Sequence, residues 1–274
     1  MSGGGGRTYV VSGAASGIGA ATTTLLRERG HRVVTVDRAE GPEGTDVVAD
    51  LATPAGRDAA LEAVRALAPV VHGVVPAAGI AGLTGTDPRL VVSVNHFGAV
   101  ALVEGLHDAL RRGAEETGDA GVVLLASNSV TCQPGWASDV AEACLAGDEE
   151  AARAAAAAHE AVAVYPATKA AVAWWARREG VGEAWAGAGV RLNAVAPGLI
   201  ATAMTDRLRE DPELGVFADL YPTAVGRPGR AAEVAEAIAF LLSPAASLLV
   251  GTVLFCDGGT DAMMHARRPE RMPG

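Results

Sequence analysis

Short apolar runs alternate with helical patterns along almost the whole chain, and this alternation constrains the fold more than any other feature of the sequence. The runs are rich in valine and leucine and apolar nearly throughout, as expected for strands covered on both faces. Strands that alternate with helices are typical of βαβ units around a parallel sheet. The predicted strands are residues 8–12, 32–37, 46–50, 71–76, 121–127, 190–196 and 252–257. The predicted helices are residues 17–29, 55–67, 88–111, 166–186 and 231–242.

The chain is predicted to form one domain, because no linker, charge block or internal repeat divides it. We place that domain at residues 7–262, between a flexible leader at residues 1–6 and a flexible tail at residues 263–274. The tail could also serve as a dimer contact. Two connections are too long for a minimal alternation of strands and helices, namely residues 132–164 and residues 199–230. Connections of that length in a compact domain are more often functional than idle.

The first of these connections is predicted to be a helical insertion. Asp148 can cap a helix in its middle, and Glu149 and Glu150 suit the positive end of that helix. An alanine run follows, and alanine has the highest helix propensity. The insertion ends just before the stretch YPATK, which opens another predicted helix.

Composition and charge exclude several classes of protein. The chain is 50% hydrophobic and 20% charged, close to ordinary globular usage, so it can bury a sizeable core. A net charge of −10 argues against a nucleic-acid partner. The three cysteines are far apart without C-x-x-C spacing, which suits a cytoplasmic protein and argues against a disulfide framework or a metal site. The most apolar run, residues 240–255, is broken by Pro244 and Gly251 and predicts no membrane span.

A glycine-rich turn, SGAASGIG at residues 12–19, directly follows the first strand and opens the first helix. Gly13 permits the tight turn, Gly17 lets the backbone approach a pyrophosphate, and Gly19 allows close packing of the helix on the sheet. The helix N-terminus supplies free N–H donors for the phosphates. Taken alone, such a string is also compatible with simple turn chemistry. In this context it predicts a doubly wound, Rossmann-type domain.

An acidic residue after the second strand supports a dinucleotide site. Asp37 ends that strand 18 residues after Gly19, where its carboxylate can accept both ribose hydroxyls of NAD. A 2′-phosphate would be repelled by the same charge, so NAD is favoured over NADP, although Arg38 could soften the discrimination. Asp50 ends the third strand in a similar way. It could face the adenine or be an ordinary loop acid.

The chain contains a single lysine, Lys169, four residues after Tyr165. The two side chains share one face if this segment is helical, and Pro166 predicts that Tyr165 lies at the very start of that helix. A free phenol has a pKa of about 10 and is a poor base at neutral pH. A nearby ammonium and an oxidised nicotinamide would both favour the phenolate. Because a guanidinium is bulkier and rigidly forked, arginine could not replace this lysine.

Together these motifs resemble the short-chain dehydrogenase/reductase superfamily over essentially residues 7–260. The motifs that carry the resemblance are Gly13-x-x-x-Gly17-Ile18-Gly19, Asn95, Ser129, Tyr165-x-x-x-Lys169 and Pro197-Gly198-x-x-x-Thr202. The resemblance implies the fold expected above, a single Rossmann-type α/β domain with a seven-stranded parallel sheet and a helical insertion before the catalytic helix.

The resemblance also implies roles for particular residues. Tyr165 would be the general acid or base, and Lys169 would be its electrostatic partner and hold the ribose. Ser129 would hydrogen-bond the substrate oxygen, although Ser127 and Asn128 are close rivals just past the same strand, and Asn95 would help to hold a proton-relay water. The backbone of Ile200 and the hydroxyl of Thr202 would position the carboxamide. The implied cofactor-binding residues are Gly13, Ser16, Gly17, Ile18, Gly19, Asp37, Asp50, Leu51, Ala78, Gly79, Tyr165, Lys169, Pro197, Gly198, Ile200 and Thr202.

Two departures from the family pattern matter. The usual Asn-Ala-Gly after the fourth strand is replaced by Ala77-Ala78-Gly79, so a structural hydrogen bond near the cofactor has to be made differently. Ser129 and Tyr165 are 36 residues apart, rather than about a dozen, because of the insertion. The insertion and the DGGTDAMM ending are similar to bacterial 3α-hydroxysteroid dehydrogenase/carbonyl reductases and coniferyl-alcohol dehydrogenases.

These features predict an NAD-dependent oxidoreductase that interconverts an alcohol and its carbonyl compound. Apolar side chains at residues 199–230, with Trp136, suit a hydroxysteroid or aryl-alcohol substrate, although each could simply pack its own segment onto the core. We expect a homodimer or homotetramer without a nucleic-acid or membrane partner. A catalytically idle nucleotide-binding protein and a methyltransferase on a similar sheet are the alternatives, and neither calls for Tyr165 and Lys169.

Overall fold

The predicted strands form one parallel sheet at the centre of the molecule. The structure is a computed structural model that describes residues 6–41 and 43–266. The strand order is β3-β2-β1-β4-β5-β6-β9, and every neighbouring pair is parallel, which confirms the Rossmann-type α/β fold with seven strands. The strands are β1 (Thr8–Ser12), β2 (Arg32–Asp37), β3 (Val47–Val48), β4 (Gly73–Pro76), β5 (Ala120–Leu125), β6 (Val190–Pro197) and β9 (Val253–Cys256).

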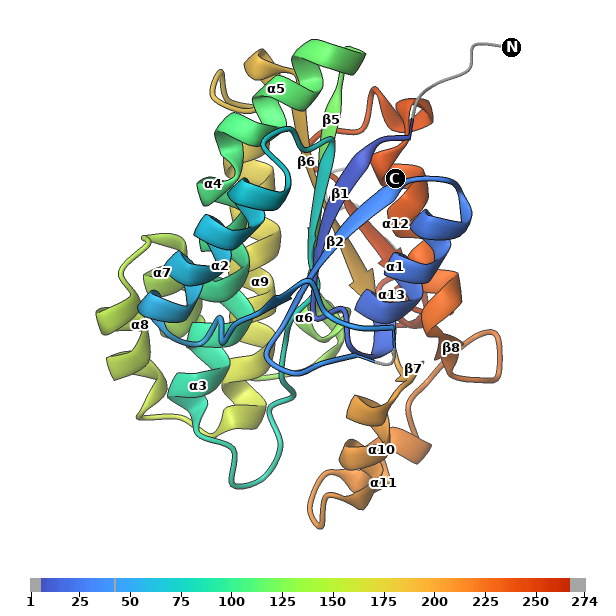
Figure 1. The fold of residues 1–274 in the computed structure, drawn as a ribbon. Helices are drawn as coiled ribbons and strands as arrows, with labels where there is room; N and C mark the ends of the chain where they lie inside the picture. Colours follow the sequence, from blue (N-terminus) through green and yellow to red (C-terminus); the bar gives the residue numbers. More distant parts are fainter. Residues whose placement is uncertain (1–5, 42, 267–274) are drawn as a thin grey trace.

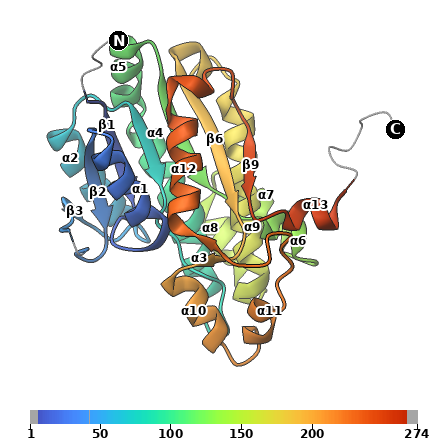
Figure 2. The ribbon, with the colours of Figure 1, turned by 90° about the vertical axis from the view of Figure 1, so that its right-hand side faces the viewer.

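Helices cover both faces of this sheet (Figures 1 and 2). One face carries α1 (Gly17–Glu28) and α12 (Ala231–Leu242), and the other carries α2 (Pro54–Leu67), α4 (Ala99–Gly105), α5 (His107–Thr117) and α9 (Ala161–Gly180). Successive strand residues therefore enter different cores. Val10 packs in the core that includes α2 and α4, whereas Val11 packs in the core of α1 and α12. Two short 3₁₀-helices are η2 (Ala186–Ala188) and η3 (Pro244–Ala246).

The helix predicted at residues 88–111 is broken, so that part of the prediction is wrong. It consists of α3 (Pro88–Val92), a π-helical turn η1 (Ser93–Gly98), α4 and α5. No single helix in the two described ranges is long and apolar enough to cross a bilayer. Within those ranges, one pair of consecutive helices, Pro88–Gly105 and His107–Thr117, is long and apolar enough when the two are counted together, but the pair is bent by 53°. Its apolar side chains, such as those of Leu102 and Leu110, are buried inside the protein.

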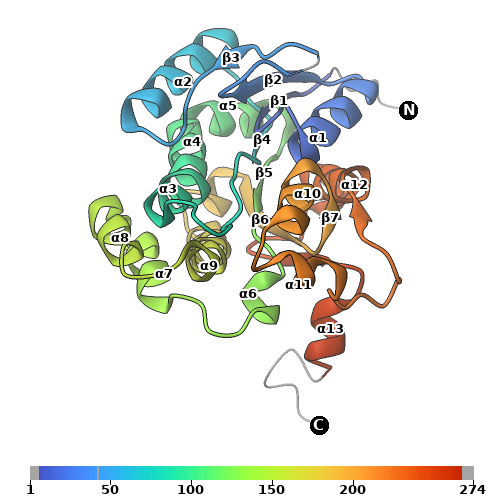
Figure 3. The same ribbon diagram turned by 90° about the horizontal axis from the view of Figure 1, so that it is seen from below.

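The short helix α6 (Ser129–Cys132) leads into the insertion, which contains α7 (Ser138–Leu145) and α8 (Glu149–Ala156). In the insertion, α7 packs beside α9, and α8 packs beside α3 (Figure 3). As predicted, Asp148 caps α8, since its Oδ1 accepts a hydrogen bond from the backbone N–H of Ala151 at 2.9 Å. The insertion also explains a difference from the sequence prediction for α9.

The helix α9 starts at Ala161 rather than at Pro166, so Tyr165 lies in its second turn and not at its start. A proline inside a helix leaves the carbonyl four residues earlier without its usual donor. Here that carbonyl belongs to Val162, and Nε2 of Gln133 in the insertion donates to it at 2.7 Å. The insertion therefore lets the helix begin one turn before the proline.

The segment predicted as a long functional loop forms two short helices and a small parallel ribbon beyond the carboxyl ends of the strands (Figure 1). These elements are β7 (Ile200–Ala201), α10 (Ala203–Glu210), α11 (Gly215–Asp219) and β8 (Gly229–Arg230). The chain end is more ordered than predicted, because α13 (Thr260–Met264) passes residue 262 and the His265 ring contacts the carbonyl of Thr131 at 2.7 Å. Residues 1–5 of the leader and residues 267–274 of the tail lie outside the described residues.

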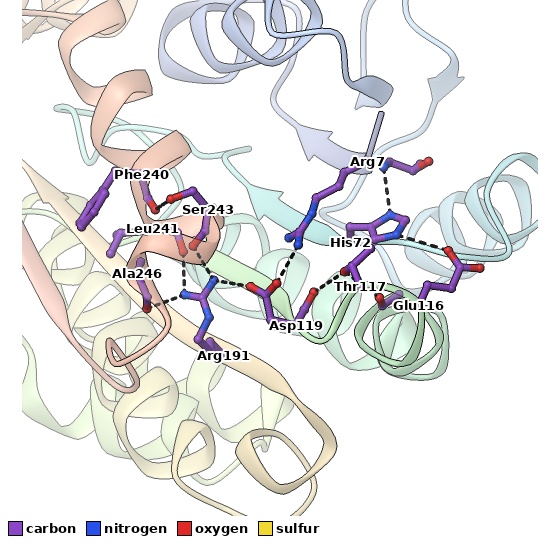
Figure 4. A network of polar contacts seen from close by, with 12 residues as sticks. Arg7, His72, Glu116, Thr117, Asp119, Arg191, Phe240, Leu241, Ser243 and Ala246 are labelled. Atoms are coloured by element: carbon purple, nitrogen blue, oxygen red, sulfur yellow. Dashed lines mark hydrogen bonds and ion pairs between the residues drawn. The ribbon is translucent and has the colours of Figure 1, made fainter. Parts of the chain in front are cut away.

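A network of ion pairs joins three strands at the opposite, amino end of the sheet (Figure 4). Asp119 lies between Arg7 and Arg191, with Oδ–Nη distances of 2.7 and 3.0 Å. The guanidinium of Arg191 is buried and also donates to the carbonyls of Leu241 in the last turn of α12 and of Ser243 and Ala246 just after it. The network therefore fastens β1, β5 and β6 to one another and to the end of α12.

Candidate active site

A cavity of about 610 Å³ lies at the carboxyl edge of the sheet, where the ends of the central strands meet. Figure 3 looks onto this edge, with α10 and α11 in front of it. Every cofactor-binding residue predicted from the sequence lines the cavity. These are Gly13, Ser16, Gly17, Ile18, Gly19, Asp37, Asp50, Leu51, Ala78, Gly79, Tyr165, Lys169, Pro197, Gly198, Ile200 and Thr202.

The glycine turn at one end of the cavity has no room for side chains at two of its positions. Gly13 has a φ of +66°, and a Cβ there would lie 2.6 Å from the backbone nitrogen of Ala78. A Cβ on Gly19 would lie 2.2 Å from the carbonyl oxygen of Gly13, so this glycine allows α1 to approach the strand. Gly17 has a φ of +57°, and its Cβ position faces only the methyl group of Thr202 at 3.6 Å. Backbone therefore lines the cavity wall, as a diphosphate site requires.

The amino end of α1 points its free N–H groups at this part of the cavity. No acidic residue occupies the first turn of α1, and the side chain of Ser16 makes no capping hydrogen bond. The positive end of the helix is therefore available to an anion. These observations fit the phosphates of a dinucleotide.

Acidic side chains lie where the second and third strands end. The carboxylate of Asp37 accepts hydrogen bonds from the backbone N–H groups of Ala15, at 3.0 Å, and Ala39, at 3.3 Å, which fix it beside the glycine turn. Asp50 accepts one from Ala52 at 3.0 Å. Arg38 also lines the cavity, next to Asp37. This end of the cavity thus offers a fixed carboxylate to a ribose, with one cation beside it.

Tyr165 and Lys169 project from α9 into the other end of the cavity. Nζ of Lys169 donates to the carbonyl of Leu125 at the end of β5, at 2.8 Å, and lies 5.8 Å from the centre of the Tyr165 ring. Burial lowers the pKa of Lys169 to about 8. Burial also raises the pKa of Tyr165, against the opposing effect of a side-chain hydrogen bond with Ser127. Burial thus raises the pKa of the phenol in the protein alone, and the lowering expected from Lys169 together with an oxidised nicotinamide stays a prediction.

The structure brings Ser127, and not Ser129, to the phenol of Tyr165, which favours the rival that the sequence left open, and the identity of the catalytic serine stays a prediction. Ser127 lines the cavity, whereas the hydroxyl of Ser129 is buried without a hydrogen-bond partner among the described residues. The backbone N–H of Ser129 donates to Oγ of Ser127 at 3.1 Å. Ser127 takes this place because β5 ends at Leu125, two residues before its predicted end, so that the residues just past the strand are two positions earlier than expected.

This placement leads to a paired prediction. Ser127→Ala is expected to lower kcat by about 10²-fold, because it removes the hydroxyl that hydrogen-bonds the phenol of Tyr165 in the cavity. Ser129→Ala, a deletion of the same size two residues away, is expected to leave kcat within about threefold, because the Ser129 hydroxyl does not line the cavity and makes no hydrogen bond among the described residues. Steady-state kinetics of both variants would decide between the two serines. A larger loss of kcat in Ser129→Ala than in Ser127→Ala would identify Ser129 as the catalytic serine.

Asn95 lies behind the cavity wall instead of lining it. Its side-chain amide pairs with both backbone groups of Ile80: Oδ1 accepts from the N–H at 2.8 Å, and Nδ2 donates to the carbonyl at 2.9 Å. A Cβ on Gly79 would lie 3.2 Å from Oδ1 of Asn95 and 3.6 Å from Nζ of Lys169. Asn95 therefore holds the wall segment after β4 close to Lys169.

Ser12 at the end of β1 was not singled out from the sequence. Its Oγ accepts a hydrogen bond from the N–H of Ala78 at 3.2 Å, so it joins β1 to the Ala77-Ala78-Gly79 segment. A polar residue at the end of a buried strand, directly before the glycine turn, was the available signal. This bond is a structural connection near the cofactor cavity.

The apolar residues expected to line a substrate pocket divide into separate groups. Met204 lines the 610 Å³ cavity. Tyr221 lines a second cavity of about 830 Å³, which lies between β9 and residues 199–230, the predicted substrate loop. Leu220 is exposed, and Trp136 packs against Trp174 at a centroid distance of 5.9 Å. The packing interpretation of Trp136 is therefore the correct one, and Leu220 faces solvent.

Two hydrogen-bonded contacts that the sequence did not indicate hold the substrate loop over the site. The hydroxyl of Tyr221 donates to Oδ1 of Asn128, next to Ser127, at 2.6 Å. Asp211 accepts hydrogen bonds from both the N–H and the hydroxyl of Thr84, at 2.8 and 2.9 Å. The loop is thus attached to the segments that follow β4 and β5.

Comparisons with known proteins agree with this geometry. Residues 149–261 match the family described as Enoyl-(Acyl carrier protein) reductase. The chain is 36% identical over 260 residues to the 3-alpha-hydroxysteroid dehydrogenase/carbonyl reductase of Comamonas testosteroni, covering 93% of this chain and 97% of the relative. It is 34% identical over 277 residues to the galactitol 2-dehydrogenase (L-tagatose-forming) of Cereibacter sphaeroides, covering 93% and 94%.

A solved structure is similar over nearly the whole chain. The 3-alpha-hydroxysteroid dehydrogenase from Pseudomonas sp. B-0831, complexed with NADH, aligns with a TM-score of 0.88 and 43% identity. The alignment covers 95% of this chain and 99% of that one. These relatives are dehydrogenases and reductases, and their similarity confirms the resemblance deduced from the motifs. The protein belongs to the short-chain dehydrogenase/reductase superfamily and is an oxidoreductase.

Proposed function

We propose that the protein interconverts a secondary or allylic alcohol and its carbonyl compound with NAD(H), and that Tyr165 is the acid or base. The observation that carries this proposal is the convergence of Ser127, Tyr165 and Lys169 in one cavity whose far end is the glycine turn. A protein that only bound a nucleotide would need the turn but not this cluster. When bound, the nicotinamide supplies the acceptor or donor of the hydride.

Each side chain of the cluster has a distinct task in this proposal. The hydroxyl of Ser127 orients the substrate oxygen next to the phenol of Tyr165, and the phenol gives or takes the proton. The ammonium of Lys169 uses one donor on Leu125, which leaves two for a ribose hydroxyl and a water. The raised pKa of Tyr165 keeps the phenol protonated at neutral pH, which suits protonation of a carbonyl oxygen during reduction.

We propose NAD rather than NADP because of Asp37. Its carboxylate is held by two backbone N–H groups, so it cannot swing away from a 2′-phosphate without losing them. Asp37→Ser is expected to raise the ratio of kcat/KM for NADP to that for NAD by about 100-fold, through loss of the repulsion and exposure of Arg38. Kinetics with both cofactors measure this ratio. An unchanged ratio would place the discrimination elsewhere.

The substrate is proposed to be an apolar cyclic or aromatic alcohol. Apolar side chains line the cavity near Tyr165, including those of Ile80, Leu83 and Val94. The named activities of the relatives span a hydroxysteroid, a sugar alcohol and cis-4-hydroxycyclohexanecarboxylate, so the class has to be measured.

Absorbance of NADH tests the proposal directly. Purified protein with NAD would be offered 3-hydroxysteroids, aryl-allylic alcohols and a hexitol as the polar control. NADH formation with one apolar class supports the proposal and chooses that class. Turnover of the hexitol alone would overturn the apolar assignment, and no turnover of any alcohol or ketone would count against the function itself.

The exposed edge of the sheet supports the proposal that the protein is a homo-oligomer. β9 is a terminal strand of the sheet, and all four of its residues are only partly buried. Leu248 and Val181 near this edge are exposed. An uncovered parallel edge is uncommon in a stable monomer. Light scattering coupled to size-exclusion chromatography distinguishes a monomer, a dimer and a tetramer.

A further inference from the structure

The helical insertion contacts the catalytic side of the molecule through four polar side chains. They form the Glu149 cluster, which consists of Arg57 of α2, Ser93 of η1, and Glu149 and Arg153 of α8. The hydroxyl of Ser93 donates to Oε1 of Glu149 at 2.8 Å, and Nη2 of Arg57 lies 2.8 Å from both carboxylate oxygens. Nη1 of Arg153 donates to Oγ of Ser93 at 2.7 Å. Glu149 therefore connects the insertion to two other elements.

The cluster is largely protected from solvent. Ser93 is fully buried, and the side chains of Arg57 and Glu149 are 9% and 23% exposed. Charge-assisted hydrogen bonds are stronger and shorter than neutral ones, and a buried carboxylate fixes the geometry of its donors. The cluster thus holds α8 in a fixed position relative to α2 and η1, in contrast to the exposed ion pairs elsewhere on the surface.

Ser93 is the first residue of the π-helical turn η1, which also contains Asn95. Asn95 clamps both backbone groups of Ile80 and stands 3.2 Å from the Cβ position of Gly79. A π-turn interrupts the regular hydrogen bonding of a helix, so its shape depends on outside contacts. The second outside contact is also to the insertion, because the His96 ring hydrogen-bonds the backbone of Cys144 at the end of α7.

Glu149 is also connected to the other end of the cavity, because its partner Arg57 contacts the segment that lines it. Nε of Arg57 donates to the carbonyl of Thr53 at 3.3 Å, just after the cavity residue Leu51. Gly98 closes η1 against the same segment, since a Cβ there would lie 3.1 Å from the carbonyl oxygen of Leu51. The π-turn is therefore held between the insertion on one side and the segment that connects β3 to α2 on the other.

We propose that Glu149 is a positioning residue, by which the insertion holds the π-turn so that Asn95 keeps the wall of the cofactor cavity next to Lys169. The insertion is then part of the catalytic apparatus, although none of its residues needs to touch the substrate. The catalytic consequence rests on the proposed function, whereas the structural consequence for Asn95 and Ile80 does not.

Three variants test this role. Ser93→Ala removes the hydroxyl that joins Glu149 to η1 and leaves the ion pair of Glu149 with Arg57 intact. Glu149→Gln removes the charge, and Glu150→Gln is the matched control, because Glu150 is the exposed neighbour on the same helix. We expect Ser93→Ala and Glu149→Gln to lower kcat by about tenfold, since small misplacements of catalytic groups are costly. KM for NAD in Ser93→Ala should stay within about twofold, and the control should match the wild type.

The double variant Ser93→Ala/Glu149→Gln shows whether the two residues act through one link. If they do, its kcat will fall no further than that of the lower single variant. Hydrogen exchange at the amide of Ile80, measured without cofactor, supplies a readout that is independent of turnover. That amide donates to Asn95, so it should exchange faster in Ser93→Ala and Glu149→Gln but not in Glu150→Gln.

Additive losses of kcat would overturn the proposal. So would a lower melting temperature with unchanged kcat and unchanged exchange at Ile80, because the cluster would then support only the stability of the insertion. If the wild type turns over no alcohol or ketone, the proposed function fails, and the exchange at Ile80 still decides whether Glu149 positions the π-turn.

Discussion

Tyr165→Phe is expected to lower kcat by about 10³-fold or more, because the variant keeps the ring but loses the hydroxyl that we propose as the acid or base. The cavity of the variant should keep its shape, since the phenylalanine ring fills the same space beside Lys169. NADH affinity should therefore stay within about threefold of the wild type, since the glycine turn and Asp37 are intact. The absorbance of NADH during turnover measures kcat, and a fluorescence titration with NADH measures its affinity.

Tyr221→Phe is the matched control for this experiment. It deletes a phenolic hydroxyl of the same kind, which donates to Asn128 and does not line the cavity of Tyr165 and Lys169. Loss of one such hydrogen bond should lower kcat/KM by about tenfold or less. Comparable losses in both variants would mean that Tyr165 has no special part in the chemistry.

Asp119→Ala is expected to reduce the free energy of unfolding by about 3–5 kcal/mol, because it leaves the buried guanidinium of Arg191 without its counter-ion. Arg7 loses the same partner, and one nitrogen of each arginine is already buried without a hydrogen bond among the described residues. For a chain of this size, we expect the melting temperature to fall by about 5–10 °C. Calorimetry and urea unfolding measure the change.

Glu115→Ala provides the comparison for an exposed ion pair. Glu115 pairs with Arg111 on the surface of α5, so its removal should cost less than about 1 kcal/mol. Equal costs for the two variants would show that the Figure 4 network adds nothing beyond a surface pair.

The contribution of Asp119 should also depend on pH. Burial raises the pKa of this carboxyl, but hydrogen bonds from Arg7 and Arg191 outweigh burial and leave the pKa lowered. A lowered folded pKa stabilises the protein above the unfolded value of about 4, and this stability is lost as the pH falls through the folded pKa. The difference between the wild type and Asp119→Ala should therefore shrink below about pH 4.

The sheet and most of the cofactor cavity were predictable, because they depend on local patterns. Each parallel strand is a short apolar run, and burial on both faces requires that pattern wherever the strand lies. The glycines at 13 and 19 follow from close backbone contacts that no side chain could occupy. Asp37 follows from its place at a strand end. In these cases the local sequence carries the physical reason.

The features that were missed depend on residues distant in the sequence. Pro166 normally predicts a helix start, and only the distant amide of Gln133 makes an earlier start tolerable. The choice between Ser127 and Ser129 turned on where β5 ends, and the apolar sequence through Ala126 does not mark that end. The π-turn at η1 depends on contacts from an insertion about 50 residues later. Periodicity within one segment cannot report such contacts.

The only lysine of the chain is buried beside the phenol of Tyr165, and its side-chain amine can be modified selectively among the side chains. With a pKa of about 8, about a quarter of Lys169 side chains would be neutral amines at about pH 7.5, against about one in a thousand for an ordinary lysine. Amine-directed acylating reagents would then mark this side chain in addition to the α-amino group of the chain, and they would reach Lys169 through the cofactor cavity. Mass spectrometry of the adduct could count vacant sites in a preparation, since a bound dinucleotide would shield the amine.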